Sequence, residues 1–389
     1  MAMIPLVYNL RSLSVRKTTT AATSIGIALV VFVLASALML SEGVTRTLGS
    51  SGHSDVAIVL RKGSDNELSS GIEDPQVGLI GSMPGVKKGT SGPIMSAESI
   101  VITSMEKVGA PGVVNLQLRG LGEEGYALRP NLKVVAGRKP APGADEVMVG
   151  ARLRGRIKGL ELGQSFDIKK NRPVTVVGVF EDGGSSHESE VWVDRDVLKT
   201  SFGRVGLVSS VRVRLEKPTS FDTFKLGVEQ DKRLGLMAMR ETVYYDKQSQ
   251  GLSIFITVLG SLVAFFVSLG AMIGATITMY ASIANRQREI GTLRALGFSR
   301  TSILVCFLLE SIALSLIGGV VGSVASLAMG AVRFSMLNFA SFSEVVFTFD
   351  PTPRIIVTAL IASGVMGVLG GFLPALRAAR VSPLTAMRG

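Results

Sequence analysis

The sequence contains very little cysteine, histidine and charge, and each shortage excludes a class of protein. The single cysteine, Cys306, cannot form an intrachain disulfide, and two histidines, His53 and His187, are too few for a multi-histidine metal site. Charged residues make up 18% of the 389 residues, against about 25% in ordinary soluble domains. The dipeptide Gly-Lys does not occur, so the phosphate-binding loop of P-loop ATPases is absent from this sequence.

Long apolar runs replace the missing charge. Four runs each reach about 20 residues, which is enough to cross the hydrocarbon core of a bilayer as a helix. Because a single segment can satisfy its backbone polar groups in lipid only as a helix, we predict four transmembrane helices, at 19–40, 254–283, 303–330 and 354–376. The chain is therefore expected to be a multi-pass membrane protein.

The first apolar run also has features of a signal peptide. It follows basic residues and contains Ala35-Ser36-Ala37, which mimics a cleavage site. However, Leu38-Met39-Leu40 continue the run beyond this point, and the run is longer than the apolar core of a typical signal peptide. We therefore expect an uncleaved helix.

The net charge of +11 is concentrated in three short segments: before the first run, between the second and third, and after the fourth. Together they hold ten basic residues and one acid, Glu289. By the positive-inside rule, both termini and the 284–302 segment are expected in the cytoplasm, and the 41–253 segment outside it. The basic excess therefore gives little support to nucleic-acid binding.

The 41–253 segment is expected to be an α+β extracytoplasmic domain. Short apolar runs separated by Pro-Gly and Gly-Gly turns predict strands, and longer mixed stretches predict helices. We expect a membrane-proximal part, about 52–92 plus 196–245, and an outer part of about 93–195. The predicted strands lie at 56–60, 99–104, 113–118, 146–149, 174–180, 190–193 and 208–215, and the helices at 74–83, 196–201 and 220–234.

The remaining segments flank or join these parts. Residues 1–18 are predicted to form an amphipathic segment on the cytoplasmic membrane surface. Residues 331–353 are expected to be an extracytoplasmic loop, and residues 377–389 a cytoplasmic tail.

Small residues recur in the apolar runs at a spacing that allows helices to pack closely in lipid. Close packing within the chain and a dimer face both fit this pattern. The residues concerned are Gly270, Gly274, Gly318, Gly322, Gly367 and Gly371.

Ionisable side chains are scarce in the apolar runs, which argues against an ion-coupled carrier or an intramembrane enzyme. Glu310 is the exception, about two turns from the cytoplasmic end of its helix. It is expected to form an interfacial ion pair with Arg294 or Arg300; a switchable pair that links the loop to the helix is the functional alternative.

The segment between the second and third predicted helices, ANRQREIGTLRALGFSRTSIL, is short, basic and helix-forming. Ile290, Leu293 and Leu296 can line one helical face. Gly297 can end this helix in a left-handed cap, and Ser299 can cap the next one. A rigid amphipathic helix of this kind can transmit a push from a cytoplasmic partner.

Two motifs resemble those of a known family. Arg288-Glu289-Ile290-Gly291 followed by Arg294-Ala295-Leu296-Gly297, together with the C-terminal PALRAARVSPLTAMR, is similar to MacB/FtsX-type permeases, the membrane subunits of type VII ABC transporters. Gly150 and the 174–184 stretch loosely resemble their extracytoplasmic domain. Because the sequence lacks a fused ATPase domain, it looks closest to the split members, which are LolC/LolE-, DevC- or MacB-like.

The resemblance implies a fold of four transmembrane helices with a large MacB-like periplasmic core domain between the first two. It implies a permease subunit in the inner membrane that drives export or extraction of a lipoprotein, lipid, peptide or small hydrophobe by mechanotransmission. It also implies that the 284–302 segment couples to the ATPase. The residues expected at that contact are Arg286, Arg288, Glu289, Ile290, Gly291, Leu293, Arg294, Leu296 and Gly297.

The same resemblance implies the partners and cofactors. Two copies of an ABC-type ATPase would hold ATP and Mg, and this chain itself would bind no cofactor or metal and carry no catalytic residue. A second permease copy or paralogue would complete a dimer, with membrane lipids around it and a periplasmic adaptor as a further candidate partner. Nucleic acid is not expected among the partners.

Two alternative functions stay open. One is an FtsX-like, non-transport regulator of a periplasmic hydrolase or sensor. The other is a membrane-anchored enzyme whose site lies in the 41–253 domain, where His187 is close in sequence to Asp182, Glu188 and Glu190 and suggests an acid–base cluster. We favour a solvated polar turn for this stretch. The basic run at Arg152, Arg154, Arg156 and Lys158 is likewise expected to be solvated surface.

Overall fold

The computed structural model describes residues 17–90 and 92–381, and the chain divides into two compact units. The membrane unit comprises Met1–Glu42, Ile254–Val332 and Thr348–Gly389. The sheet unit comprises Gly43–Ser253 and Arg333–Phe347. Most of the predicted N-terminal amphipathic segment and of the predicted tail lies outside the described residues.

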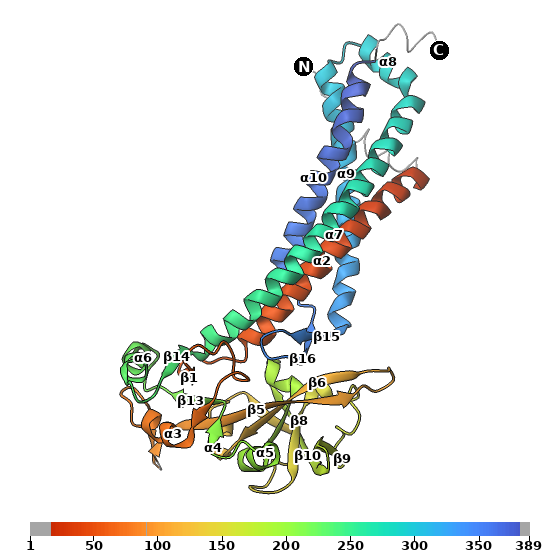
Figure 1. The fold of residues 1–389 in the computed structure, drawn as a ribbon. Helices are drawn as coiled ribbons and strands as arrows, with labels where there is room; N and C mark the ends of the chain where they lie inside the picture. The colour runs from red at the N-terminus through yellow and green to blue at the C-terminus, as the bar shows by residue number, and fades with distance from the viewer. Residues whose placement is uncertain (1–16, 91, 382–389) are drawn as a thin grey trace. The chain divides into compact units, whose positions relative to one another are not determined.

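The membrane unit is built on four long helices, α2 (Lys17–Gly49), α7 (Glu241–Asn285), α9 (Arg300–Leu327) and α10 (Pro353–Ala379), shown in Figure 1. Each is long and apolar enough to cross a membrane. The apolar runs predicted where the membrane-spanning parts lie, but not where the helices end. α7 begins at Glu241, well before residue 254, because its polar first turns are held by the sheet unit, as described below.

Small residues bring α9 and α10 together. Gly319 lies against Ser363 and Gly371 against Ser311, and the Ser311 hydroxyl donates to the Gly367 carbonyl at 2.8 Å. Such close approach gives dispersion contacts and hydrogen bonds, which hold helices together where lipid supplies no hydrophobic drive.

The sheet unit is organised around a continuous, mostly antiparallel sheet. The strand order is β14-β1-β13-β5-β6-β11-β8-β10-β7, with β9 also paired to β10. Only the β6–β11 and β8–β10 pairings in this sheet are parallel. The strands are β1 (Val56–Arg61), β5 (Met95–Glu106), β6 (Val113–Leu121), β7 (Leu132–Gly137), β8 (Glu146–Gly150), β9 (Ser165–Lys169), β10 (Arg172–Asp182), β11 (Glu190–Asp194), β13 (Ser210–Arg214) and β14 (Leu236–Arg240).

Short elements complete this unit. The helices are α3 (Asp74–Gly81), α4 (Glu123–Ala127), α5 (Arg195–Phe202) and α6 (Phe221–Gln230), and three-residue or four-residue turns include η1 (Ala151–Leu153) and η2 (Ser186–Ser189). Three two-stranded ribbons are formed by β2 (Ile72–Glu73) with β12 (Leu207–Val208), β3 (Lys88–Gly89) with β4 (Gly92–Pro93), and β15 (Arg333–Asn338) with β16 (Ser343–Thr348).

Two of the hydrophobic clusters in the sheet unit share strand β5. Ala97 belongs to the core that holds Val59, Phe224 and their neighbours, and Val101 to the core that holds Leu118 and its neighbours. The first core takes residues from 57–97 and 208–238, and the second takes residues from 101–198. Strand β5 is twelve residues long, and Ala97 and Val101 lie on the same face of it because side chains alternate along a strand. One strand can therefore contribute a residue to each core.

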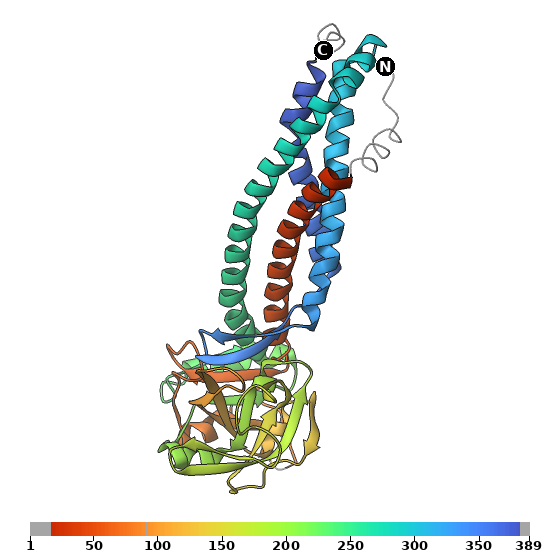
Figure 2. The ribbon, with the colours of Figure 1, turned by 90° about the vertical axis from the view of Figure 1, so that its right-hand side faces the viewer.

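The 331–353 segment was expected to be a loop, but it contains the β15–β16 hairpin, which Figure 2 shows as a blue ribbon along one side of the sheet unit. Val345, Val346 and Phe347 are buried, so this short apolar run serves the sheet unit and not the adjacent span. The hairpin contacts the 93–195 part of the sheet unit, where Lys107 pairs with Glu344 at 3.4 Å.

Candidate functional site

The segment between α7 and α9 contains a nine-residue helix, α8 (Gln287–Ala295). Gly297, with φ of +94°, lies in the left-handed region that favours glycine and ends the helical turn. The Ser299 hydroxyl accepts a hydrogen bond from the Ser302 amide at 3.1 Å and caps α9. The chain therefore leaves α7, forms one short helix and enters α9 without a long loop.

One face of α8 is anchored in the membrane unit. Ile290 is buried in a cluster with Ile283 of α7, Ile303 and Phe307 of α9, and Ala375 of α10. The Ile290 side chain therefore packs in a cluster that includes residues of three long helices. A displacement of α8 would have to move those helices with it, because close-packed interiors do not deform continuously.

The opposite face of α8 is accessible. Gln287, Arg288, Glu289 and Thr292 are exposed, and Leu296 is 73% exposed. The predicted apolar face is therefore wrong in one respect: Ile290 and Leu293 point inward, but Leu296 does not. Each three-residue step falls about 60° short of a full helical turn, so Leu296 lies about 120° around the helix from Ile290 and outside its buried face.

Arg286 binds two carboxylates at the junction of α7 and α8. Its Nη1 lies 3.0 Å from Oε2 of Glu310 on α9, and its Nε lies 2.8 Å from Oε2 of Glu289 on α8. Its guanidinium also lies over the ring of Phe307, 5.1 Å from the centroid. The side chains of Arg286 and Glu310 are buried.

The expected partners of Glu310 were wrong. Arg294 donates to the Phe298 carbonyl at 3.1 Å instead. Arg300 begins α9, ten residues before Glu310, which corresponds to about 15 Å along a helix. Arg286 reaches Glu310 because the chain turns sharply after α7 and brings the junction back over α9.

The six predicted packing glycines fall into two groups. Gly318 and Gly322 of α9 lie against the α2 backbone at Ser24 and Ala28, and Gly367 and Gly371 of α10 lie against serines of α9. By contrast, a Cβ on Gly270 or Gly274 of α7 would meet no described atom of this chain within 4 Å. Close packing within the chain therefore accounts for four of the six.

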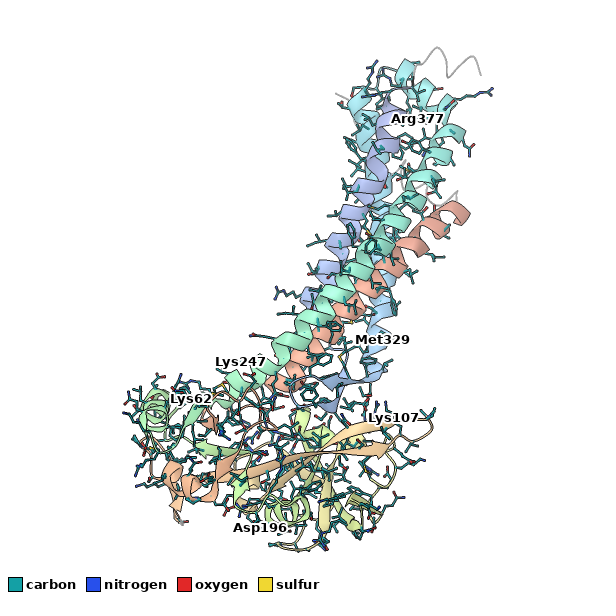
Figure 3. All side chains as sticks on the ribbon, viewed as in Figure 1. Lys62, Lys107, Asp196, Lys247, Met329 and Arg377 are labelled. Atoms are coloured by element: carbon teal, nitrogen blue, oxygen red, sulfur yellow. The ribbon has the colours of Figure 1, made fainter. Side chains whose placement is uncertain are left out.

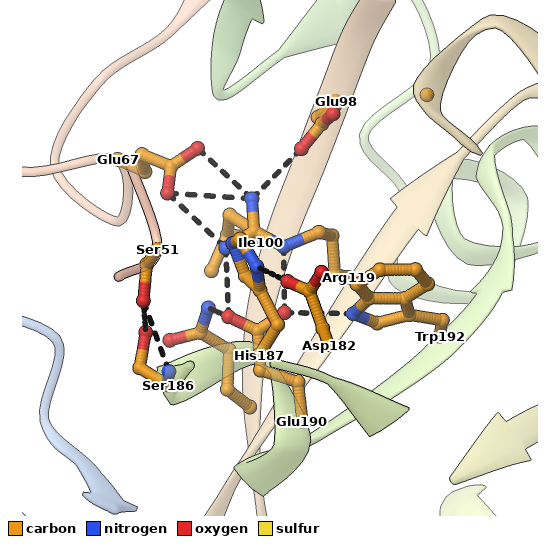
Figure 4. Close-up of polar contacts among 12 residues, drawn as sticks. Ser51, Glu67, Glu98, Ile100, Arg119, Asp182, Ser186, His187, Glu190 and Trp192 are labelled. Atoms are coloured by element: carbon orange, nitrogen blue, oxygen red, sulfur yellow. Dashed lines mark hydrogen bonds and ion pairs between the residues drawn. The ribbon is translucent and has the colours of Figure 1, made fainter. Parts of the chain in front are cut away.

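A larger set of charged side chains is buried in the sheet unit (Figure 4), and Glu190 is its one member that the sequence suggested as a site residue. Its centre is Arg119 of β6, whose Nε lies 2.7 Å from Glu190 and whose Nη1 lies 2.8 Å from Glu98 and 3.2 Å from Glu67. We call it the buried ion network; its members are Glu67, Glu98, Arg119, Arg129, Glu190, Arg212 and Glu241.

Arg212 of β13 connects this network to α7. Its Nη1 lies 2.8 Å from Glu67 and 2.7 Å from Glu98, and its Nε lies 2.7 Å from Oε1 of Glu241, the first residue of α7. Its Nη2 donates to the Tyr245 hydroxyl at 3.2 Å. Arg119 and Arg212 are each 1% exposed, so water contributes little to their solvation.

Electrostatics keep the network charged. Burial alone would raise the pKa of Glu67, but the attraction of Arg119 and Arg212 outweighs it and holds that pKa far below its usual range. Burial also opposes ionisation of Glu98, and Arg129, Arg212 and Arg119 together hold its pKa well below its usual value. The two carboxylates are therefore anionic at neutral pH.

A second buried polar cluster adjoins the network and corrects the expected solvated turn at 183–189. His187 is 1% exposed; its Nδ1 lies 2.7 Å from Oδ2 of Asp182, and its Nε2 lies 2.9 Å from the Tyr245 hydroxyl. Burial raises the pKa of Asp182, but hydrogen bonding and charge from His187 lower it to about 2. Ser186 bonds to Ser51, just after α2, at 2.8 Å.

The polar stretch around His187 looked like a loop because its partners are distant in sequence. Both imidazole nitrogens are engaged by Asp182 and Tyr245, which gives the catalytic alternative no support. Gly150 fits the same packing: its Cα approaches the Glu188 backbone so closely that a Cβ there would clash.

The expected basic surface run is also partly wrong. Arg152 is half-buried; it pairs with Glu188 at 3.1 Å and donates to the Val346 carbonyl of β16 at 2.7 Å. Lys158 pairs with Glu106 at 2.8 Å. Arg152 therefore fastens the β15–β16 hairpin to the sheet.

Three segments that continue into the membrane helices make polar contacts in the network or beside it. Ser51 follows α2, Glu241 begins α7, and Ser343 of the hairpin donates to Gln117 at 3.3 Å. A cavity of about 20 Å³ lies among Glu67, Arg119 and neighbouring residues of α2, α7 and the hairpin; it is large enough for one water molecule. Among the described residues, no group of three or more His, Cys, Asp or Glu side chains could hold a metal ion.

Comparison with known proteins identifies the architecture. The model of the MacB-like periplasmic core domain matches residues 19–230, and that of the FtsX-like permease C-terminal region matches residues 261–383. The chain belongs to the MacB/FtsX-type family of ABC transporter permeases. With its four membrane helices, this membership confirms the predicted fold class and indicates a multi-pass membrane protein with an extracytoplasmic domain.

Relatives of this permease are consistent with that assignment. It is 30% identical over 297 residues to the macrolide export ATP-binding/permease protein MacB of Hahella chejuensis, covering 70% of this chain and 43% of that protein. It is 28% identical over 227 residues to the uncharacterized ABC transporter permease MJ1507 of Methanocaldococcus jannaschii, covering 57% of this chain and 56% of that protein. The chain thus spans about half the length of these relatives.

Two solved structures are similar to part of the chain. The extracellular domain of the noncanonic ABC-type transporter YknZ from Gram-positive bacteria has 20% identity and a TM-score of 0.35, covering 47% of this chain and 99% of that one. The periplasmic region of MacB from Actinobacillus actinomycetemcomitans has 12% identity and a TM-score of 0.36, covering 49% and 90%.

Proposed function

We propose that this permease couples ATP hydrolysis on a separate ABC-type ATPase to motion of its sheet unit, and so drives export or extraction of a lipoprotein, lipid, peptide or small hydrophobe. ATP and Mg would be bound by the ATPase. α8 and both termini would lie in the cytoplasm, and a second permease copy or paralogue would complete the dimer.

The geometry of α8 supports this proposal best. A coupling element needs an accessible face for its partner and a buried face that moves the membrane helices. α8 has both, with Leu296 exposed and Ile290 packed against α7, α9 and α10. The Arg286–Glu310 pair adds a charged contact to α9.

Two helices supply the path to the sheet unit in this proposal. α2 and α7 each contribute residues to both units. At the sheet-unit end, Arg212 holds Glu241 of α7, and Ser186 holds Ser51 after α2. These buried contacts would transfer helix motion to the sheet.

The test is capture of the ATPase by the tagged, full-length chain from its native membranes. Leu296→Asp places a charge on the accessible face and is expected to lower ATPase recovery about ten-fold or more, as loss of a buried anchor does at interfaces. Val205→Asp is the matched control, because Val205 is 72% exposed but lies in the sheet unit.

Capture should identify a P-loop ATPase whose activity the wild-type chain and Val205→Asp alter equally. Undiminished recovery and unchanged activity with Leu296→Asp would show that α8 is not the contact. Failure of the wild-type chain to recover any ATPase would contradict the proposed function itself.

A further inference from the structure

The sheet unit contains a second, larger cavity, of about 250 Å³. It lies where the chain leaves β5, next to η1 and the β15–β16 hairpin. Lys107, labelled in Figure 3, directly follows β5 and lines the cavity. The volume is a little below the range of about 300–1,000 Å³ typical of small-molecule pockets, so the cavity suits a small or slender ligand.

The floor of the cavity is apolar. Its side chains come from three places: strand β6, the η1 region and strand β16. Four of these floor side chains also belong to the hydrophobic core around Leu118. Part of the apolar surface of that core therefore lines the cavity. The floor residues are Val114, Leu116, Leu153, Ile157 and Val346.

The rim of the cavity is polar and carries more positive than negative charge. Lys107 and Arg156 are the cations, and Glu344 is the lining carboxylate. Lys107 pairs with Glu344 at 3.4 Å, and the Ser335 hydroxyl donates to Glu344 at 2.7 Å. Glu344 is thus already satisfied by neighbours, which leaves the rim with one uncompensated positive charge.

We propose that this cavity binds an amphipathic anion, with an acyl chain of modest length on the apolar floor and a carboxylate or phosphate at Arg156 and Lys107. An apolar floor with a few polar groups at one end is the usual form of a pocket for such a ligand. A guanidinium is well suited to carboxylate and phosphate oxygens, because its N–H groups can donate two parallel hydrogen bonds.

The chain connection favours a ligand that comes from the membrane surface. Ser335 of the cavity rim follows Ala331, the last residue of a candidate span, by four residues, so a short stretch of chain joins the rim to a membrane-spanning segment. A ligand in the cavity would contact both the β5–β6 tip and the hairpin that joins α9 to α10. This inference goes beyond the proposed function, since binding needs neither nucleotide nor ATPase.

The experiment uses the full-length chain in membranes and three photoreactive probes with the same chain and a diazirine: a decanoate, a decyl phosphate and a decyltrimethylammonium. After irradiation, mass spectrometry locates the labelled peptides. We expect the two anions, but not the cation, to label the segments around Val114 and Ile157. The ratio of carboxylate to phosphate labelling distinguishes a fatty acid from a lipid phosphate as the source.

Two variants test the two ends of the site. Val114→Trp fills the floor, and Arg156→Glu reverses the rim charge. Each should reduce labelling of the site about ten-fold, the loss expected when one charge-assisted hydrogen bond or an equivalent contact is removed. Val205→Trp and Arg61→Glu make the same changes elsewhere in the sheet unit and should leave labelling unchanged.

Circular dichroism identifies any variant that fails to fold, and Arg156→Glu, at a partly exposed position, provides an independent test if Val114→Trp misfolds. Equal labelling of the site by anions and cation, or undiminished labelling in a folded Val114→Trp or Arg156→Glu variant, would overturn the proposal. Because no ATPase takes part, such a result would leave the proposed coupling function untouched.

Discussion

The two units each contain a buried ion cluster, and the two clusters differ in size and in how they are assembled. In the membrane unit, Arg286 binds Glu289 and Glu310, which lie 3 and 24 residues away in sequence. In the sheet unit, Arg212 binds Glu67 from 145 residues away. The first cluster follows from one turn between two helices, whereas the second exists only after the whole sheet has formed.

The difference also concerns exposure. Glu289 is 45% exposed, so water can reach part of the Arg286 cluster. The network around Arg119 and Arg212 is buried throughout, and each of these two arginines contacts three carboxylates. Removing one arginine from such a site leaves buried charge behind, and this costs far more than the pair itself contributes.

Each unit carries one native reporter, so the comparison can be tested in the intact chain. Trp192, the single tryptophan, is fully buried in the sheet unit, and its Nε1 donates to Glu190 of the network at 2.8 Å. Cys306, the single cysteine, is buried in α9 of the membrane unit. Tryptophan fluorescence and reaction with a thiol-reactive dye therefore report on the two units separately.

The largest effect is expected from Arg212→Leu. The variant would leave Glu67, Glu98 and Glu241 with fewer buried cations, and the expected destabilisation is about 3–5 kcal/mol. The Trp192 transition in denaturant should move strongly and the Cys306 transition much less. Arg233→Leu, which removes an exposed arginine paired with Asp231, serves as control and should cost about 0–1 kcal/mol. Equal shifts in both variants would contradict a structural role for the network.

Acid should act on the same network, with an effect on the order of a few kcal/mol. The folded-state pKa values of Glu67 and Glu98 lie below the ordinary value of 4.5. Their contribution to stability is therefore complete above about pH 4.5 and is lost as pH falls below it, because the unfolded state then binds more protons. Denaturant titrations at several pH values should show the Trp192 midpoint falling below that pH.

Glu67→Gln sharpens the acid experiment. The variant is expected to be less stable at neutral pH but to lose less stability on acidification, since one titrating group has been removed. The Cys306 transition should change less over the same pH range. A wild-type Trp192 midpoint that is constant from pH 7 to pH 3 would contradict the charged state of the network.

The two units also differ in how much of their structure could be predicted from the sequence. Continuous apolar runs predicted all four membrane helices, since length and hydropathy alone suffice there. In the sheet unit the alternation of β13 places Val211 and Val213 in a core and turns Arg212 to the other face, which ordinarily suggests solvent. That face is instead covered by Glu67 and the start of α7, which only the tertiary fold brings there.

The candidate sites show the same difference between local motifs, which could be predicted, and contacts between distant residues, which could not. α8 could be predicted because its motif is local, but its charge pairing could not, since Arg286 reaches Glu310 only through the turn after α7. The polar stretch at His187 was misjudged for a related reason: its partners Tyr245 and Ser51 come from α7 and the end of α2. A charged residue flanked on both sides by apolar strand residues, as Arg212 is by Val211 and Val213, is the signal that could have indicated burial.

The smallest effect is expected in the membrane-unit cluster. A double-mutant cycle of Arg286→Gln and Glu310→Gln should give a coupling energy of about 1–2 kcal/mol, within the range for contacting residues, measured from the thermal transition of Cys306. The matched cycle of Arg300→Gln with Glu310→Gln should give a value near zero, because Arg300 begins α9 well away from Glu310. Trp192 should report little change in either cycle. If the Arg300 cycle instead gave the larger coupling, the turn after α7 would not bring Arg286 to α9, and α8 would lose its charged contact with that helix.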